Sequence, residues 1–132
     1  MPEARLATAA DQPAVSALFV DAGWQEYPAD EVWVLCESAD VVGVMTLIDL
    51  APSLAFIDAV IVAQELRRQG IATEMLTKVL ASRTSTWWLE CREELTSLYE
   101  PCGFRVMDAV PDEVRAHVPE RTDRIQQFMR RG

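Results

Sequence analysis

The stretch that decides the fold is Val60-Ile61-Val62-Ala63-Gln64-Glu65-Leu66-Arg67-Arg68-Gln69-Gly70-Ile71-Ala72-Thr73. It opens with β-branched residues typical of a buried strand, continues as a polar loop, and becomes helical after Gly70. The first amides of a helix lack intrahelical partners and lie at the positive end of its dipole, so this junction predicts an anion site. Glycine permits close backbone approach, and Arg67 and Arg68 would add charge-assisted hydrogen bonds. Taken alone, the junction also fits an ordinary left-handed turn before a surface helix.

The residues before this stretch predict a strand, a helix and an antiparallel meander. Asp11 is the expected N-cap of the helix, which Gly23 ends. Polar turns at Ser38-Ala39-Asp40 and Pro52-Ser53 separate the strands of the meander. The expected strands are Arg5–Thr8, Val32–Cys36, Val41–Leu50 and Leu54–Ala63.

The residues after it alternate between helix and strand. The spacing predicts helices over Ile71–Arg83 and Glu93–Glu100, and strands over Thr86–Cys91, Phe104–Met107 and Arg124–Arg130. Residues 108–123 receive no assignment. Antiparallel strands followed by alternating strands and helices indicate the α/β class: a single domain over residues 1–132 with a mixed sheet, antiparallel in its first half, a parallel pair in the middle, and helices on both faces.

Charge is distributed unevenly along the chain. The formal net charge is −9, which argues against nucleic acid or an anionic membrane as a partner. Residues 1–60 carry ten acidic side chains and one basic one, so the whole excess lies in the first half. This excess fits either an ordinary solubilising surface or a field that attracts a cationic substrate.

Cysteine and histidine usage argues against a metal site. The three cysteines, Cys36, Cys91 and Cys102, lack the spacing of metal ligands, and His117 is the single histidine. We expect free thiols in a reducing cytoplasm. No apolar run approaches the roughly 18 residues that span a bilayer, and the start resembles no signal peptide.

Two motifs resemble the GCN5-related N-acetyltransferase (GNAT) superfamily. Arg67-Arg68-Gln69-Gly70-Ile71-Ala72 is similar to the family's acetyl-CoA motif, and it follows the apolar strand at the family's usual offset. Leu98-Tyr99-Glu100-Pro101-Cys102-Gly103-Phe104 is similar to its Leu-Tyr-Glu-x-x-Gly-Phe landmark. The resemblance covers roughly residues 5–107. Trp88-Leu89-Glu90-Cys91-Arg92 is closest to a strand of the bacterial ribosomal-protein alanine acetyltransferases.

The resemblance implies how acetyl-CoA would bind. The strand backbone would pair with the pantetheine arm and polarise the thioester carbonyl, while the amides from Arg68 to Thr73 would receive the pyrophosphate. No metal is implied. The implied cofactor-binding residues are Val60, Ile61, Val62, Arg67, Arg68, Gln69, Gly70, Ile71, Ala72 and Thr73.

The resemblance also implies an acid and a base. Tyr99 would protonate the departing CoA thiolate; the alternative is a core tyrosine that only hydrogen-bonds the cofactor. Glu90 is the candidate base, yet the chain is about three residues shorter before the tyrosine helix and lacks the family's usual asparagine there. Glu90 therefore stands as a base, a substrate-orienting carboxylate or a structural partner of Arg92. Asp58, an acidic residue inside an otherwise apolar strand, is the second candidate for the base, and a water molecule is the third.

The expected acceptor is a primary amine on a cationic small molecule or peptide. A lysine-like amine of pKa about 10.4 costs ~4.6 kcal/mol to deprotonate at pH 7, so such an acceptor needs a base. The short segment after the first helix suggests an open acceptor site, and the acidic first half favours a cation. The alternative is a catalytically silent acyl-CoA-binding regulatory module. Because dimers are frequent in the family, a homodimer is a candidate assembly.

Overall fold

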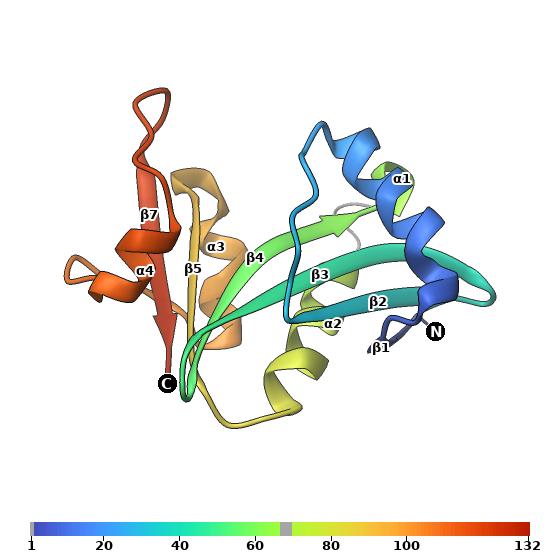
Figure 1. The fold of residues 1–132 in the computed structure, drawn as a ribbon, viewed down its shortest axis with the longest axis horizontal. Helices are drawn as coiled ribbons and strands as arrows, with labels where there is room; N and C mark the ends of the chain where they lie inside the picture. The colour runs from blue at the N-terminus through green and yellow to red at the C-terminus, as the bar shows by residue number, and fades with distance from the viewer. Residues whose placement is uncertain (1, 67–69) are drawn as a thin grey trace. The chain divides into compact units, whose positions relative to one another are not determined.

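Seven strands form one mixed sheet in the computed structural model, which describes residues 2–66 and 70–132. The strand order is β1-β2-β3-β4-β5-β7-β6 (Figure 1). The pairs β1–β2 and β2–β3 are antiparallel and β4–β5 is parallel, which confirms the predicted antiparallel first half and parallel pair. The chain divides into two compact units, and the long strands β3 and β4 contribute to both.

The first unit comprises Met1–Leu47 and Ala59–Arg83. Both predicted hairpin turns are present, with Ser38 and Ser53 in the left-handed region (φ 56° and 62°) that short turns require. The elements of this part of the chain are β1 (Glu3–Leu6), a 3-10 turn η1 (Ala9–Asp11), α1 (Gln12–Ala22), β2 (Glu31–Glu37), β3 (Asp40–Ala51), β4 (Leu54–Val62), η2 (Gln64–Leu66) and α2 (Ile71–Ala81).

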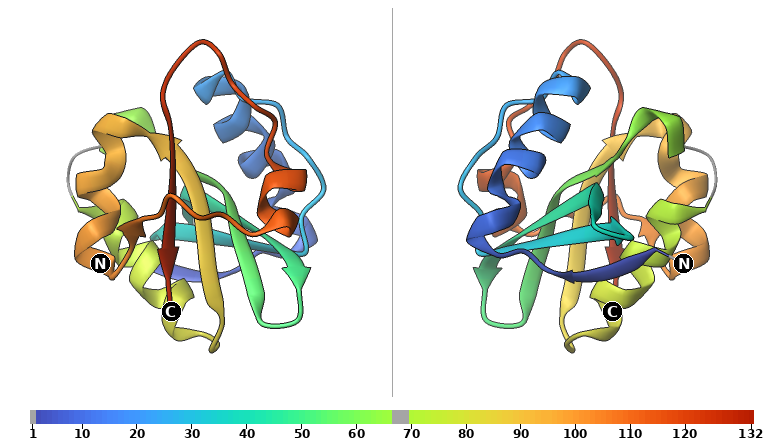
Figure 2. Two further views of the ribbon diagram at one scale, coloured as in Figure 1. Left: turned by 90° about the vertical axis from the view of Figure 1, so that its left-hand side faces the viewer. Right: turned by 90° about the vertical axis from the view of Figure 1, so that its right-hand side faces the viewer.

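Helices cover both faces of the sheet within the first unit, as predicted (Figure 2). Val15, Leu18 and Phe19 of α1 recur at helical spacing and pack on one face, against Val34 of β2 and Val44 of β3. The second helix, α2, contacts β1 and β2 and buries an apolar stripe of its own. Because successive side chains of a strand point to opposite faces of the sheet, β2 and β3 can contribute side chains to the packing on both faces.

Asp11 ties β1 to the start of α1. Its carboxylate accepts two hydrogen bonds from the Arg5 guanidinium (2.8 and 3.0 Å) and one from the Thr8 N–H (2.7 Å). Asp11 is the N-cap residue of α1, as predicted, but its side chain turns back to Thr8 instead of capping α1. The Arg5 hydrogen bonds hold the pKa of Asp11 well below its usual range.

Asp11→Asn is expected to lower Tm at neutral pH by a few degrees, because a neutral amide forfeits the charge-assisted bonds to Arg5. A depressed folded-state pKa stabilises the protein above the unfolded pKa of about 3.9, and this contribution is lost as pH falls through the folded value. The Tm difference between wild type and variant should therefore shrink below about pH 4. Thermal unfolding followed by circular dichroism from pH 3 to 7 measures it; an equal difference at both ends would contradict the assignment.

The second unit comprises Ile48–Asp58 and Thr84–Gly132. Its core contains Phe56 of β4, Trp88 of β5, Val114 of α4 and Phe128 of β7. Strand β7 pairs antiparallel with both β5 and β6. The remaining elements are β5 (Thr86–Arg92), η3 (Glu93–Leu95), α3 (Thr96–Tyr99), η4 (Glu100–Cys102), β6 (Arg105–Val106), α4 (Asp112–His117) and β7 (Gln126–Arg131).

The structure differs from the sequence predictions at several places; for example, β7 begins at Gln126 and not at Arg124, and α2 ends at Ala81 and not at Arg83. Strand β1 begins two residues before the predicted Arg5, and the helix expected over Glu93–Glu100 is a succession of 3-10 and α turns. Helix α4 lies in the segment left without assignment, because Val114 is its single fully buried residue and leaves no apolar period to detect. In the described part of the chain, no helix has the length and apolarity to cross a membrane.

Candidate active site

The start of α2 leaves space for a large anion. Gly70 is the N-cap residue, with φ +75°, and a Cβ placed there would meet no atom of the described residues within 4 Å, its chain neighbours apart. Having no side chain, Gly70 cannot cap the amides of the first turn, which follow in Ile71, Ala72 and Thr73. An open, glycine-led helix start fits a diphosphate group. The predicted contacts Arg67, Arg68 and Gln69 lie outside the described residues.

The parallel pairing of β4 with β5 ends early. Residues 54–56 pair with 86–88, the last pair being Phe56 with Trp88, although β4 runs on to Val62 and β5 to Arg92. Two residues beyond that pair, Asp58 on β4 and Glu90 on β5 follow on the same side of their strands by alternation. Phe56 and Trp88 belong to the cluster that contains Val114 of α4, so both carboxylates lie on the α4 side.

Glu90 is held by an arginine of the segment that leads into β7. Arg124 Nη1 lies 2.6 Å from Glu90 Oε2, and Nη2 lies 3.0 Å from Oε1, which makes a bidentate pair. The side chains are 17% and 10% exposed respectively, so water screens this pair little. The ionic partner seen for Glu90 is Arg124, whereas Arg92 was the partner considered in one of the three roles that the sequence left open for Glu90.

Asp58 forms a hydrogen bond with His117, the single histidine of the chain. Its Oδ1 lies 3.1 Å from Nε2 of His117, the last residue of α4. The imidazole also packs edge-to-face on Phe56, with ring centroids 5.0 Å apart. A carboxylate that accepts a hydrogen bond from one ring nitrogen of a histidine orients the imidazole and leaves the other ring nitrogen as an acceptor.

Tyr99 closes the short helix α3 and is buried. Its ring packs edge-to-face on Phe104, with centroids 6.0 Å apart. Burial raises the pKa of Tyr99 well above its usual range, and the neighbouring thiols of Cys91 and Cys102 add to the effect. Burial likewise raises the pKa of Cys91 to about 11, which keeps that thiol protonated. Tyr99 therefore remains a proton donor at any neutral or mildly alkaline pH.

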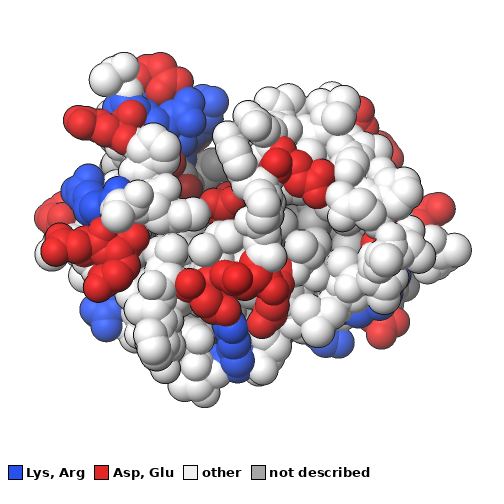
Figure 3. All heavy atoms as spheres, viewed as in Figure 1, with Lys and Arg blue, Asp and Glu red and all other residues white. Residues whose placement is uncertain are grey.

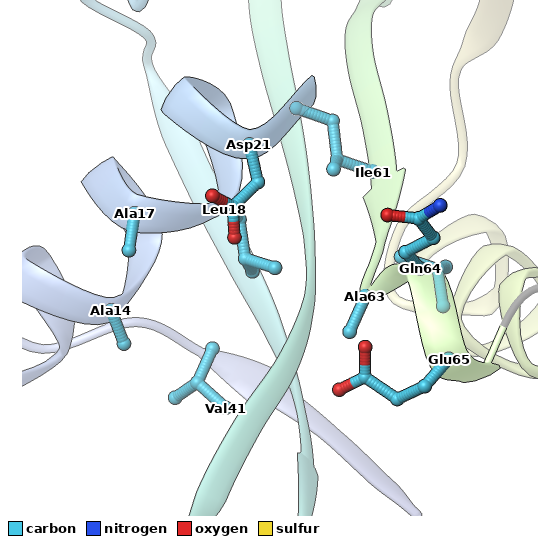
Figure 4. Close-up of a pocket in the computed structure, with 10 residues that line it drawn as sticks. Ala14, Ala17, Leu18, Asp21, Val41, Ile61, Ala63, Gln64 and Glu65 are labelled. Carbon is cyan, nitrogen blue, oxygen red and sulfur yellow. The ribbon is translucent and has the colours of Figure 1, made fainter. Parts of the chain in front are cut away.

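A groove of about 480 Å³ lies between α1 and the end of β4 (Figure 4). Small side chains of Ala14 and Ala17 form one wall, and η2 contributes to the other. Two carboxylates, Asp21 and Glu65, line it. Their negative charge disfavours the binding of a phosphate in this groove, which therefore does not fit the predicted anion site.

Charge on the visible face is mostly acidic (Figure 3). Basic groups gather with acidic ones around the loop that leads into β7, where Arg121 pairs with Asp123 and Arg124 with Glu90. The Arg121 guanidinium holds the pKa of Asp123 below its usual range. Among the described residues, no cluster of histidine, cysteine and acidic side chains could hold a metal ion.

Residues 4–104 match the profile of the Acetyltransferase (GNAT) family. The chain belongs to this family. No curated protein sequence is significantly similar to this GNAT chain. Many solved structures share its fold.

N-acetylglutamate synthase from Neisseria gonorrhoeae, complexed with coenzyme A and N-acetyl-glutamate, is 16% identical with a TM-score of 0.75. That alignment covers 99% of the GNAT chain and 35% of the synthase, so the chain spans about a third of it. A GNAT family acetyltransferase from Elizabethkingia anophelis with acetyl-CoA bound is 14% identical, with a TM-score of 0.68 and coverage of 98% and 97%. A variant spermidine N-acetyltransferase from Vibrio cholerae is 15% identical, with a TM-score of 0.77 and coverage of 98% and 92%. At these identities the likeness establishes the fold.

The residues predicted for the site fall into two groups in this GNAT domain. The described cofactor-binding candidates, at the end of β4 and the start of α2, belong to the first unit, whereas Tyr99, Glu90 and Asp58 belong to the second. Sequence reasoning missed His117 and Arg124. The signal in the sequence that points to His117 is that it is the single histidine of the chain.

Proposed function

We propose that this GNAT domain is an acetyl-CoA-dependent N-acetyltransferase that transfers the acetyl group directly to a primary amine on a cationic small molecule or peptide. The observation that carries the proposal is the open start of α2 at Gly70, which follows β4 and the loop after it in the chain order that the family resemblance predicts. Bound acetyl-CoA would supply an activated acyl thioester. In the described part of the chain Cys36, Cys91 and Cys102 form no disulfide, which is compatible with a reducing cytoplasm.

The residues of this chain have distinct tasks in the proposed reaction. Amides of Ile71 to Thr73 would bind the diphosphate, and β4 beyond Phe56, which β5 does not pair, would offer backbone groups at Val60 to the pantetheine arm. Tyr99, kept protonated by burial, would protonate the leaving thiolate. Glu90, fixed by Arg124, would contact the acceptor as base or orienting carboxylate.

The acceptor preference follows from charge. Residues 1–60 hold the whole net charge of −9, and the Glu90–Arg124 pair adds no net positive charge to the second unit. Such a field raises the local concentration of cations and slows the approach of anions. The spermidine acetyltransferase among the structural neighbours is in keeping with a cationic acceptor.

A turnover screen tests the proposal. With acetyl-CoA at saturation, we expect kcat/KM for polyamines and lysine peptides to exceed that for glutamate and aspartate by about tenfold or more at low salt, with the preference shrinking as salt rises. Release of free CoA thiol measures turnover. A preference for acidic amino acids would refute the cationic acceptor. Tight acetyl-CoA binding, seen as a raised Tm, without CoA release for any amine would favour the silent regulatory module.

A further inference from the structure

Helix α4 brings the chain's single histidine to β4. His117 Nε2 and Asp58 Oδ1 are 3.1 Å apart, and within residues 2–66 and 70–132 the imidazole has no other polar partner. Because a carboxylate only accepts hydrogen bonds, Nε2 carries the hydrogen and Nδ1 keeps its lone pair. An imidazole oriented by a carboxylate through one nitrogen, with the other nitrogen available, has the arrangement of a general base.

The surroundings hold this imidazole in one place while leaving it accessible. Phe56 packs against the ring with its centroid 5.0 Å away, and Asp58 fixes the rotation of the ring. Both side chains of the pair are 28% exposed, so protons can pass to solvent. His117 thus combines a fixed orientation with a route for the proton, and a base needs both.

The two carboxylates beyond the last β4–β5 pair are used differently. Glu90 engages both of its oxygens with the Arg124 guanidinium, at 2.6 and 3.0 Å. Removing a proton from an ammonium group through Glu90 would compete with this bidentate pair. Asp58 uses Oδ1 to hold an imidazole, which has the ordinary pKa closest to neutrality of all side chains. Of the two, the Asp58 side is the better suited to proton abstraction.

The opposite faces of β5 separate this pair from the proposed acid. Trp88 and Glu90 face α4, whereas Cys91, the next residue, faces the other way and lies near Tyr99 of α3. Helices α3 and α4 accordingly lie on opposite sides of β5 (Figure 2). In direct transfer the amine adds to the carbonyl carbon and the thiolate leaves the resulting tetrahedral intermediate, so the base that serves the nitrogen and the acid that serves the sulfur act on different atoms and can lie apart.

We propose that His117 is the general base that deprotonates the acceptor amine, with Asp58 as its positioning residue. This inference rests on the proposed N-acetyltransferase function. Nδ1 of His117 takes one proton from the ammonium group and passes it to solvent. The amine lone pair then forms the C–N bond to the acetyl carbonyl carbon, and the C–S bond breaks with its electron pair on sulfur. Tyr99 protonates the thiolate and is reprotonated by the second proton that leaves the nitrogen, so the net release is one proton per amide.

His117→Gln tests the base. The glutamine amide can still donate to Asp58 but cannot accept a proton, so kcat for a lysine-type amine should fall by roughly 100-fold. The KM for acetyl-CoA should change by less than about twofold. Asp58→Asn should lower kcat by roughly tenfold through misorientation of the ring. Glu113→Gln removes a charge from the exposed first turn of the same helix and serves as the matched control, with activity unchanged.

Two readouts separate catalysis from folding. The loss in His117→Gln should fall to less than about fivefold for an amine whose pKa lies below the assay pH, such as 2,2,2-trifluoroethylamine, because such an amine is already neutral. In His117→Ala, added imidazole should restore at least about tenfold of the lost activity towards the lysine-type amine. Circular dichroism and Tm check that each variant folds.

The outcomes distinguish a failure of the proposed N-acetyltransferase function from a failure of the assignment of His117 as its base. A wild-type protein that releases no CoA with any amine overturns the proposed function and this inference together. An active wild type whose His117→Gln variant loses equal activity with every amine, or whose His117→Ala variant does not respond to imidazole, overturns the base alone. A loss that depends on amine pKa in Glu90→Gln, and not in His117→Gln, would assign the base to Glu90.

Discussion

Replacing Gly70 with aspartate is expected to raise the Kd for acetyl-CoA by about 100-fold or more. Gly70 has φ +75°, a region that aspartate tolerates better than most residues, and the space around its Cβ position is open. The variant should therefore fold. Its carboxylate would lie beside the first amides of α2, which we propose to bind the diphosphate, and like charges brought together at a binding site cost several kcal/mol. A 100-fold loss corresponds to about 2.7 kcal/mol.

Two variants control for strain and bulk. Gly70→Asn has almost the same size and tolerates the same φ but carries no charge, so it should weaken binding much less. Gly23→Asp places a carboxylate on another glycine of nearly the same φ, +73°, with equally open space, at the end of α1. It should bind acetyl-CoA like the wild type. Isothermal titration calorimetry measures all three, and wild-type affinity in Gly70→Asp would remove the start of α2 as the anion site.

The sheet was predictable because each of its signals is local. Alternating apolar residues mark β2 to β4, and the short polar turns between them appear with Ser38 and Ser53 at positive φ. The helix start after Gly70 was likewise predictable from the local sequence, because a strand, a loop and a helix follow one another along the chain. Features that depend on neighbours along the chain were recovered with small errors at their ends.

The partners of the site residues were not predictable, because they are remote in sequence. Asp58 and His117 are separated by 59 positions, and Glu90 and Arg124 by 34. Arg92 is closer to Glu90 in the sequence and lies on the same side of β5, so proximity in the sequence favours Arg92 as the ionic partner of Glu90. The fold decides otherwise, because Phe128 of β7 lies directly opposite Glu90 and the segment before β7 supplies Arg124. Helix α4 has six residues, which is too short for a helical repeat of apolar residues to be recognised in the sequence.

Tyr99→Phe is expected to lower kcat by about tenfold or more with little change in the Kd for acetyl-CoA. Phenylalanine preserves the edge-to-face packing on Phe104 and the apolar volume, so the variant loses the hydroxyl proton alone. Steady-state kinetics and calorimetry separate the two quantities. An unchanged kcat would remove Tyr99 as the acid and leave it as a core residue. A raised Kd with unchanged kcat would make it a cofactor contact instead.

The size of this effect follows from acidity. The ordinary pKa of a phenol is about 10, burial raises that of Tyr99 further, and a thiol has a pKa of about 8.5. Proton transfer to the thiolate is therefore uphill unless the phenolate recovers a proton from the amine nitrogen, so the expected loss can lie below the usual range of about 100-fold to 10,000-fold for acid–base catalysis. Because the pKa is raised, Tyr99 stays protonated as pH rises, and the wild type should show no loss of kcat from this group up to about pH 10. A pH profile of kcat checks this point.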